Sequence, residues 1–297
     1  MSRHKVNGPW QDEQMFGTLI TVAPTGAETA KADCPQLPTT LDELVAEAKA
    51  CQAAGAALIH VHVRDDEHLP TLDVGRLRAT VEALREQTDL VVQLSTGGSV
   101  HDPLEQRLKV LDAEPDSCSL TCGTTNFGDA VFLNPFAFMS ALYVQAQERQ
   151  VVPEFELFEL GHVSALRRLI DAHGLPFGGQ VHVDFVTGVP GGMPGTVAAL
   201  AAGVQMLPPE VTSWSATGIG RAHLPIAAAA LAMGGHLRVG LEDTLAFAKG
   251  QPVRDNAQLV ERAALLADLL QRPPLTCDEA RNLLAVHDRR TDTKGQV

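Results

Sequence analysis

Short β-strand patterns alternate with longer helical patterns along almost the whole of this chain. Runs rich in valine, isoleucine and leucine, such as 56–63 and 179–186, are followed by amphipathic segments such as 40–54, 73–87 and 162–173. This alternation is typical of parallel sheets whose strands are joined by helices. Eight repeats within about 250 residues match the count and size of a (β/α)₈ TIM barrel, an α/β fold that forms a single domain. A doubly wound open sheet is the alternative.

The eight predicted strands share a short, β-rich composition and lie near residues 17–23, 56–63, 89–95, 117–121, 153–158, 179–186, 211–216 and 236–241. Thr39 or Thr40 together with Glu43 predicts a capping box at the start of the first helix. Gly55 and Gly174 lie where the helices before them should end.

We expect a catalytic barrel over residues 17–272, with an N-terminal extension (1–16) before it and a C-terminal helix and polar tail (273–297) after it. The stretch 186–196, VTGVPGGMPGT, contains too many glycines and prolines for regular structure. It is either an active-site loop or an irregular surface loop.

Composition excludes several classes of partner. The formal net charge of −13 argues against nucleic acid and anionic membranes as ligands of the surface as a whole. Five cysteines without a C-x-x-C pair argue against a disulfide framework and against a thiolate zinc site. No apolar run approaches the roughly 20 residues of a membrane helix, and no secretory signal is recognisable. We therefore expect a cytoplasmic protein.

Polar and ionisable residues follow most of the predicted strands. In a TIM barrel the functional groups gather at the carboxyl ends of the strands, so these residues should meet at one end of the barrel. The segments are APTGAE (23–28), HVHVRDD (60–66), QLSTGG (93–98), SLTCGTTNFG (119–128), PEFELFELGH (153–162) and RVGLED (238–243).

Two histidines on the second strand suggest a metal site. His60 and His62 are two residues apart, so their side chains project from the same face of the strand. Glu242 follows the eighth strand, which a closed barrel brings back to the first strand and within reach of the second. Two imidazoles and a carboxylate that leave positions open are typical of a catalytic zinc. Alternatively, both histidines are hydrogen-bonded core residues.

Six motifs together resemble one enzyme family. PTGAETAK, AALIHVHVRDD, QLSTGG, LTCGTTNFG, PEFELFELGH and RVGLEDT occur in the order and spacing of the β-keto acid cleavage enzymes, formerly a domain of unknown function, from about residue 17 to 290. The resemblance implies a zinc-dependent (β/α)₈ enzyme. Such an enzyme condenses a β-keto acid with acetyl-CoA and releases acetoacetate and a new acyl-CoA. It also implies a homo-oligomer, either a tetramer or a dimer.

The resemblance further implies roles for individual residues. The metal ligands would be His60, His62 and Glu242, with Asp243 as the catalytic acid and base and Arg238 beside it. Hydroxyl groups at Ser95 and Ser119 fall at matching positions, as do substrate-binding residues at Glu28, Glu156, Gly97 and Gly98.

Three functional alternatives follow from these patterns. The first is the acetyl-CoA-dependent cleavage of a β-keto acid. The second is another metal-dependent barrel, a hydrolase or aldolase acting on a small carboxylate substrate, although such hydrolases usually carry H-x-H on the first strand. The third is a barrel that binds a metabolite without catalysis. If Glu28 and Glu156 both line the far end of the pocket, a cationic substituent on the keto acid would be matched electrostatically, as in an aminohexanoate or a dehydrocarnitine.

Overall fold

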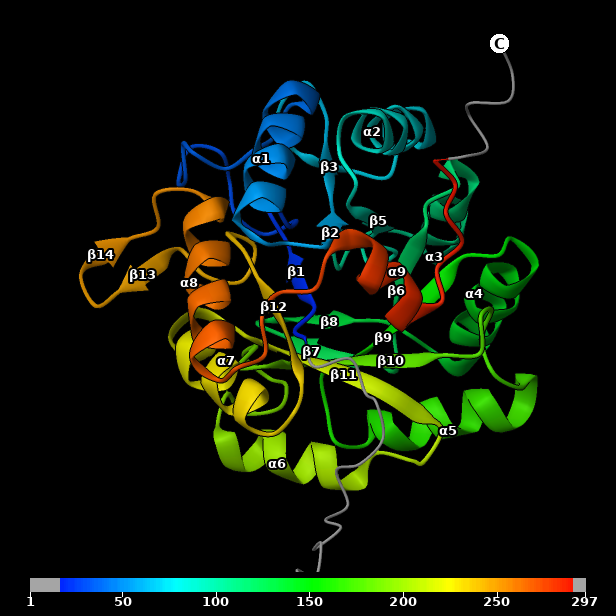
Figure 1. The fold of residues 1–297 in the computed structure, drawn as a ribbon. Helices are drawn as coiled ribbons and strands as arrows, with labels where there is room; N and C mark the ends of the chain where they lie inside the picture. The colour runs from blue at the N-terminus through cyan, green and yellow to red at the C-terminus, as the bar shows by residue number, and fades with distance from the viewer. Residues whose placement is uncertain (1–16, 291–297) are drawn as a thin grey trace, which may run out of the picture.

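The computed structural model describes residues 17–290 as a closed barrel of eight parallel strands (Figure 1). Around the barrel the strands are β1 (Ile20–Val22), β2 (Leu58–Val61), β5 (Val91–Leu94), β6 (Ser117–Thr121), β9 (Val152–Leu157), β10 (Val181–Thr187), β11 (Val211–Gly218) and β12 (His236–Val239). Thr21 of β1 pairs with Leu58 of β2 on one side and with Arg238 of β12 on the other, which closes the ring. The predicted TIM barrel is confirmed, and the open sheet is excluded.

Helices between the strands form the outer layer of the barrel (Figure 1). They are α1 (Leu41–Ala54), α2 (Val74–Gln87), α3 (Leu104–Leu108), α4 (Phe136–Glu148), α5 (His162–His173), α6 (Val197–Met206), α7 (His223–Ala232) and α8 (Asn256–Leu269), with 3₁₀ turns at Lys109–Ala113 and Gly220–Ala222. The predicted capping box is present at Thr40 and Glu43, and Gly55 ends α1 in the left-handed conformation with a φ of 113°. These residues determine where α1 begins and ends.

The amino-terminal end of the barrel is closed by the last helix, α9 (Cys277–Leu284), which lies across it in Figure 1. Ala280 and Leu284 of α9 pack in one apolar cluster with Leu19, Leu58 and Val152 from the starts of three strands. This helix lies where the sequence predicted one. The predicted N-terminal extension and the end of the polar tail fall outside the described residues, and the division of the chain into three segments stays a prediction.

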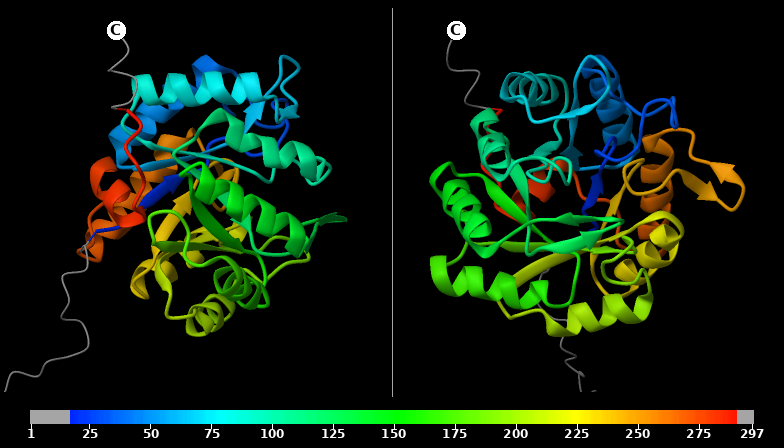
Figure 2. Two further views of the ribbon diagram at one scale, coloured as in Figure 1. Left: turned by 90° about the vertical axis from the view of Figure 1, so that its right-hand side faces the viewer. Right: turned by 180° about the vertical axis from the view of Figure 1, so that it is seen from behind.

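The opposite end of the barrel carries three small hairpins that interrupt the βα rhythm. They are β3–β4 (Val63–Arg64 and Pro70–Thr71), β7–β8 (Thr125–Phe127 and Ala130–Phe132) and β13–β14 (Ala246–Ala248 and Gln251–Pro252). In the right-hand view of Figure 2 the β7–β8 hairpin crosses the mouth of the barrel. Each hairpin follows the carboxyl end of a barrel strand, so together they shape the entrance to whatever the barrel binds.

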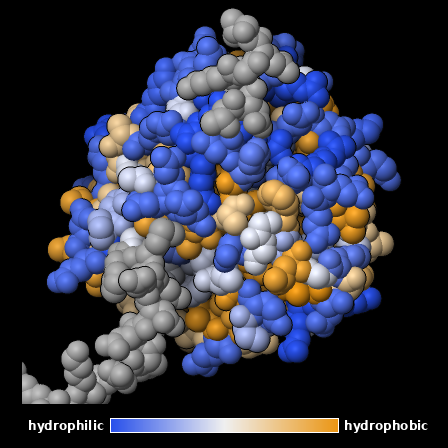
Figure 3. Space-filling model, turned by 45° about the vertical axis from the view of Figure 1, so that its right-hand side comes forward, coloured by the Kyte–Doolittle hydropathy of each residue, from blue (hydrophilic) through white to orange (hydrophobic). Residues whose placement is uncertain are grey.

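The outer surface mixes polar and apolar residues. On the face shown in Figure 3 hydrophilic residues cover most of the area, and hydrophobic residues form smaller patches between them. Within residues 17–290, no helix has the length and apolar character required to span a bilayer.

Candidate active site

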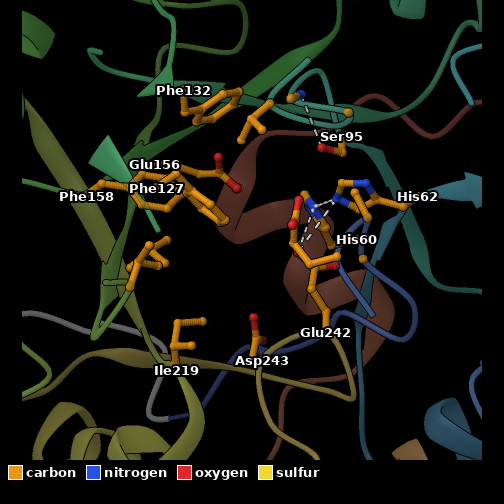
Figure 4. A pocket seen from close by; sticks show the side chains of 18 of the residues that line it. His60, His62, Ser95, Phe127, Phe132, Glu156, Phe158, Ile219, Glu242 and Asp243 are labelled. Carbon is orange, nitrogen blue, oxygen red and sulfur yellow. Dashed lines mark hydrogen bonds and ion pairs between the residues drawn. The ribbon is translucent and has the colours of Figure 1, made fainter. Parts of the chain in front are cut away.

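A cavity of about 200 Å³ opens at the carboxyl end of the barrel (Figure 4). Ten of the eleven site residues predicted from the sequence line it: Glu28, His60, His62, Ser95, Gly97, Gly98, Glu156, Arg238, Glu242 and Asp243. Ser119 does not line the cavity. Its Oγ is buried and accepts a hydrogen bond from the Thr96 N–H at 3.2 Å, under the turn that carries Gly97 and Gly98.

His60, His62 and Glu242 form a compact cluster on one side of the cavity. The two Nε2 atoms are 3.3 Å apart, and Glu242 Oε1 lies 3.9 Å from His60 Nε2 and 3.6 Å from His62 Nε2. One ligand atom from each of the three residues falls within 4.8 Å of the others. His60 Nδ1 is 2.5 Å from Gln93 Oε1, so Nδ1 carries the hydrogen and Nε2 presents its lone pair to the cluster.

The charge state of this cluster suits a divalent cation. Burial, together with the positive charge of Arg238, lowers the pKa of His60 to about 3, and burial lowers the pKa of His62 as well. Burial opposes the ionisation of Glu242, but the positive charge of Arg238 outweighs it and holds the pKa of Glu242 at about 2. Glu242 Oε2 is buried without a hydrogen-bond partner. Two neutral imidazoles and an unsatisfied carboxylate oxygen are the donor set of a catalytic zinc, so these residues fit the predicted metal.

Arg238 of β12 connects three carboxylates beside the cluster. Its Nε donates to Asp243 Oδ2 at 3.2 Å, its Nη2 donates to Asp243 Oδ1 at 3.0 Å, and its Nη1 lies 3.4 Å from Glu156 Oε1. Nη2 also contacts Glu242. Burial raises the pKa of Asp243 to about 7 although Arg238 opposes the shift. A carboxyl group that titrates near neutrality can both accept and return a proton.

The loop after β1 holds Glu242 in place, and sequence reasoning did not identify the two residues responsible. Gly26 has a φ of +64°, and a side chain there would begin 2.6 Å from Glu242 Cγ. Arg64 is buried and donates from Nε and Nη2 to the Gly26 carbonyl at 3.1 and 2.7 Å. Gly26 and Arg64 both lie in motifs quoted from the sequence, APTGAE and HVHVRDD. Their contact was not predicted because it joins residues 38 positions apart in the chain.

An apolar wall faces the charged cluster across the cavity, and it too was not predicted. It consists of Phe127, Phe132, Phe158, Val186, Val189 and Ile219. Phe127 and Phe132 come from the β7–β8 hairpin. Val186 is the last residue but one of β10, and it and Val189 both belong to the Gly/Pro-rich stretch 186–196, so this stretch lines the candidate active site.

A barrel with these groups at its catalytic end defines the chain as a TIM-barrel enzyme with a candidate metal site. The family model described as beta-keto acid cleavage enzyme matches residues 18–286. The chain therefore belongs to the beta-keto acid cleavage enzyme family, which confirms the resemblance of the six motifs and the assignment as an enzyme that cleaves β-keto acids.

The names of similar proteins refer to different substrates. The 3-keto-5-aminohexanoate cleavage enzyme of Acetoanaerobium sticklandii is 37% identical over 270 residues, covering 90% of this chain and 98% of that protein. The 3-oxoadipate:acetyl-CoA acetyltransferase of Cupriavidus necator is 34% identical over 278 residues, covering 92% of this chain and 96% of that protein. Among solved structures, ObcA without ligand superposes with a TM-score of 0.73 over 85% of this chain and 66% of its own, at 20% identity, which supports the fold alone.

Proposed function

We propose that the chain transfers the acyl group of a β-keto acid to coenzyme A, with acetyl-CoA as co-substrate and a divalent metal, most simply zinc, held by His60, His62 and Glu242. The overall reaction is R–CO–CH₂–COO⁻ plus acetyl-CoA giving R–CO–CoA plus acetoacetate. The observation that carries the proposal is the cluster of His60, His62 and Glu242 directly beside the Arg238–Asp243 pair in one cavity. Acetyl-CoA as the co-substrate, which donates its acetyl group and supplies coenzyme A, is supported by the name of the C. necator relative.

The first step is removal of a proton from the α-carbon of the keto acid. When bound, the metal would supply Lewis acidity to the ketone and carboxylate oxygens, which makes that proton more acidic. Asp243 receives the proton at a carboxylate oxygen. Arg238 cannot accept a proton, so its two hydrogen bonds hold Asp243 in one orientation and offset its charge.

The remaining steps exchange two carbon–carbon bonds. The α-carbon attacks the acetyl carbonyl, a C–C bond forms, and coenzyme A leaves as a thiolate. The thiolate then attacks the original ketone carbon, the old C–C bond breaks to give the new acyl-CoA, and Asp243 returns its proton to acetoacetate. Ser95 Oγ lines the cavity and accepts the Gly97 N–H at 3.2 Å, so its own proton can be donated to developing oxygen charge.

Ser119 supports this site from outside the cavity. Its Oγ accepts the Thr96 N–H, and its carbonyl accepts the Thr96 hydroxyl at 2.6 Å. We therefore infer that Ser119 positions the turn that bears Ser95 and Gly97 and does not contact substrate.

Removal of the metal should abolish turnover. Purified protein is incubated with acetyl-CoA and a panel of β-keto acids, and new acyl-CoA is identified by its mass while bound metal is quantified on the same sample. Dialysis against a chelator should reduce acyl-CoA formation to background, and about one equivalent of zinc should restore it, because the metal ligands lie in the cavity itself. Undiminished turnover by metal-free protein would contradict the proposed role of the cluster.

Gly26→Ala should weaken metal binding, because the new methyl group would push Glu242 away from the two histidines. We expect a loss of roughly 10- to 100-fold in zinc affinity, the usual cost of disturbing groups that orient metal ligands. Gly250→Ala is the matched control: its φ of +75° imposes similar backbone strain, but a side chain there meets nothing within 4 Å. Equal zinc affinities in both variants would show that Gly26 does not position Glu242.

We also propose a homo-oligomer, a dimer or tetramer, as the family resemblance implies. Leu265 and Leu269 on α8 are 64% and 80% exposed and give the outer surface apolar side chains that a second copy could cover. Light scattering on the purified protein tests this. The cytoplasmic location stays a prediction.

A further inference from the structure

We infer that the natural substrate is a β-keto acid whose substituent beyond the ketone is uncharged and apolar, and that the apolar wall selects it. The inference rests on the proposed function and adds to it the chemical class of the substrate. It also assigns a specificity-determining role to the wall residues, to which the sequence analysis gave no role.

Most ionisable side chains lie on one side of the cavity and the phenyl rings on the other, with the Glu156 carboxylate beside the rings (Figure 4). His60, His62 and Glu242 lie together with Asp243 beside them, Phe127 and Phe158 lie across the open space from the two histidines, and Ile219 lies next to Asp243. All but one of the ionisable residues that line the cavity contact Arg238 directly or, in the case of the two histidines, contact Glu242, which contacts Arg238. The exception is Glu28, whose side chain is exposed. A keto acid that places its carboxylate and ketone at His60 and His62 therefore directs its substituent toward the wall.

Three phenyl rings give the wall a defined shape. Phe127, Phe132 and Phe158 contact one another with ring centroids 6.2, 6.2 and 6.3 Å apart and interplanar angles of 72°, 56° and 75°. The contacts of Phe132 with the other two rings are edge-to-face, a favourable arrangement for aromatic side chains. Val186 and Val189 pack with Phe158 in a buried apolar cluster. The wall is thus a continuous apolar surface.

The backbone around the wall is held before substrate arrives. The Arg107 guanidinium lies 4.7 Å from the centroid of Phe132, and Arg107 donates to the carbonyls of Thr96 and Leu133 at 2.7 Å each. The Gly128 N–H, at the tip of the β7–β8 hairpin, donates to the Pro190 carbonyl at 2.8 Å and joins the hairpin to the active-site loop. A fixed wall costs little ordering on binding, which favours a substituent that fits it.

The six residues of the wall offer no charged group to a charged substituent. Glu156, which the sequence analysis considered together with Glu28 as a partner for a cationic substituent, directs Oε1 to Arg238 at 3.4 Å and accepts the Thr121 hydroxyl on Oε2 at 2.8 Å. Both oxygens therefore already accept from the protein, and these two contacts hold the carboxylate in place. Arg238 is already surrounded by carboxylates, so it offers nothing to a second substrate carboxylate. Desolvating a charge without compensation is expensive, and the cationic substituent considered from the sequence is therefore disfavoured.

The test is a substrate series on the metal-loaded enzyme. 3-Oxopentanoate, 3-oxohexanoate and 3-oxoheptanoate yield propionyl-, butyryl- and pentanoyl-CoA, whereas 3-oxoadipate and 3-keto-5-aminohexanoate carry a charge at the far end. We expect kcat/KM to rise about three- to fourfold with each added methylene, from the transfer free energy of a CH₂ group, and to be at least about tenfold lower for both charged substrates. Formation of acyl-CoA fastest from a charged substrate would overturn this inference and leave the proposed function intact. No acyl-CoA from any member would overturn both.

A variant of the wall gives a second readout. Ile219 is only partly buried, so Ile219→Glu should fold, and its carboxylate should lower kcat/KM for 3-oxohexanoate at least about tenfold while raising the relative rate with 3-keto-5-aminohexanoate. Ile219→Val is the matched control and should change kcat/KM less than about fourfold, the effect of one methylene. Melting temperature and bound zinc are measured on both variants. An unchanged preference in a folded, zinc-loaded Ile219→Glu protein would show that the wall does not select the substituent.

Discussion

Replacing His60 with alanine is expected to remove the metal and the activity together. His60 Nε2 is one of three ligand atoms within 4.8 Å of one another, and the remaining pair of ligands could not hold zinc against exchange with water. We expect zinc affinity to fall by more than about 100-fold, which exceeds the usual effect of residues behind the ligands. Acyl-CoA formation should fall to background, and metal analysis of the purified variant should find less than stoichiometric zinc.

His182→Ala is the matched control for this experiment. His182 is as buried as His60 and also stands on a barrel strand, but it does not line the cavity, and its Nδ1 pairs with Ser213 Oγ at 2.7 Å. Both variants lose a buried imidazole, so both should be less stable. Only His60→Ala should lose zinc. Stoichiometric zinc in folded His60→Ala would contradict the assignment of this ligand.

Asp243→Asn should give the opposite combination, with zinc retained and turnover lost. The amide has nearly the shape of the carboxylate, and Asp243 is not one of the three clustered ligands. The asparagine side chain cannot accept the α-proton of the substrate, so kcat should fall by roughly 10²- to 10⁴-fold, the usual contribution of a general base. Steady-state kinetics and metal analysis on one preparation separate the two effects.

Asp184→Asn controls for the loss of a buried charge. Asp184 is fully buried on β10 and accepts hydrogen bonds from Ser215 and Thr217, but it does not line the cavity. Removing its charge changes the electrostatics of the barrel interior without removing a group that can reach substrate. We expect this variant to keep most of its turnover. If Asp243→Asn turned over as fast as Asp184→Asn, another group would have to take the proton.

The fold and the cluster of His60, His62 and Glu242 were predictable because both follow from regular periodicities, whereas the roles of Asp243 and Arg238 were implied only by the resemblance of the motifs. Strand–helix alternation fixes a parallel barrel, and the carboxyl ends of its strands meet at one end. The two-residue repeat of a strand places His60 and His62 on one face, and barrel closure brings Glu242 to them although it is 180 positions further along the chain.

The apolar half of the site was not predictable in the same way. Phe127 and Phe132 lie on hairpin strands of three residues each, which are too short to show a periodic pattern. Phe158 looked like the end of a core strand. The Gly/Pro-rich stretch could be recognised as irregular, but nothing in its composition says which side chains turn inward. The pairing of Glu156 with Arg238 was not predictable either, because it joins residues 82 positions apart in the chain.

Anomalous X-ray scattering at the zinc edge, measured on crystals of the zinc-loaded protein, tests the central claim most directly. One strong peak should lie between His60 Nε2, His62 Nε2 and the Glu242 carboxylate, at about 2.0–2.2 Å from each ligand atom. A peak elsewhere, or a fully loaded protein in which one of these three groups is too far from the ion to bind it, would contradict the claim.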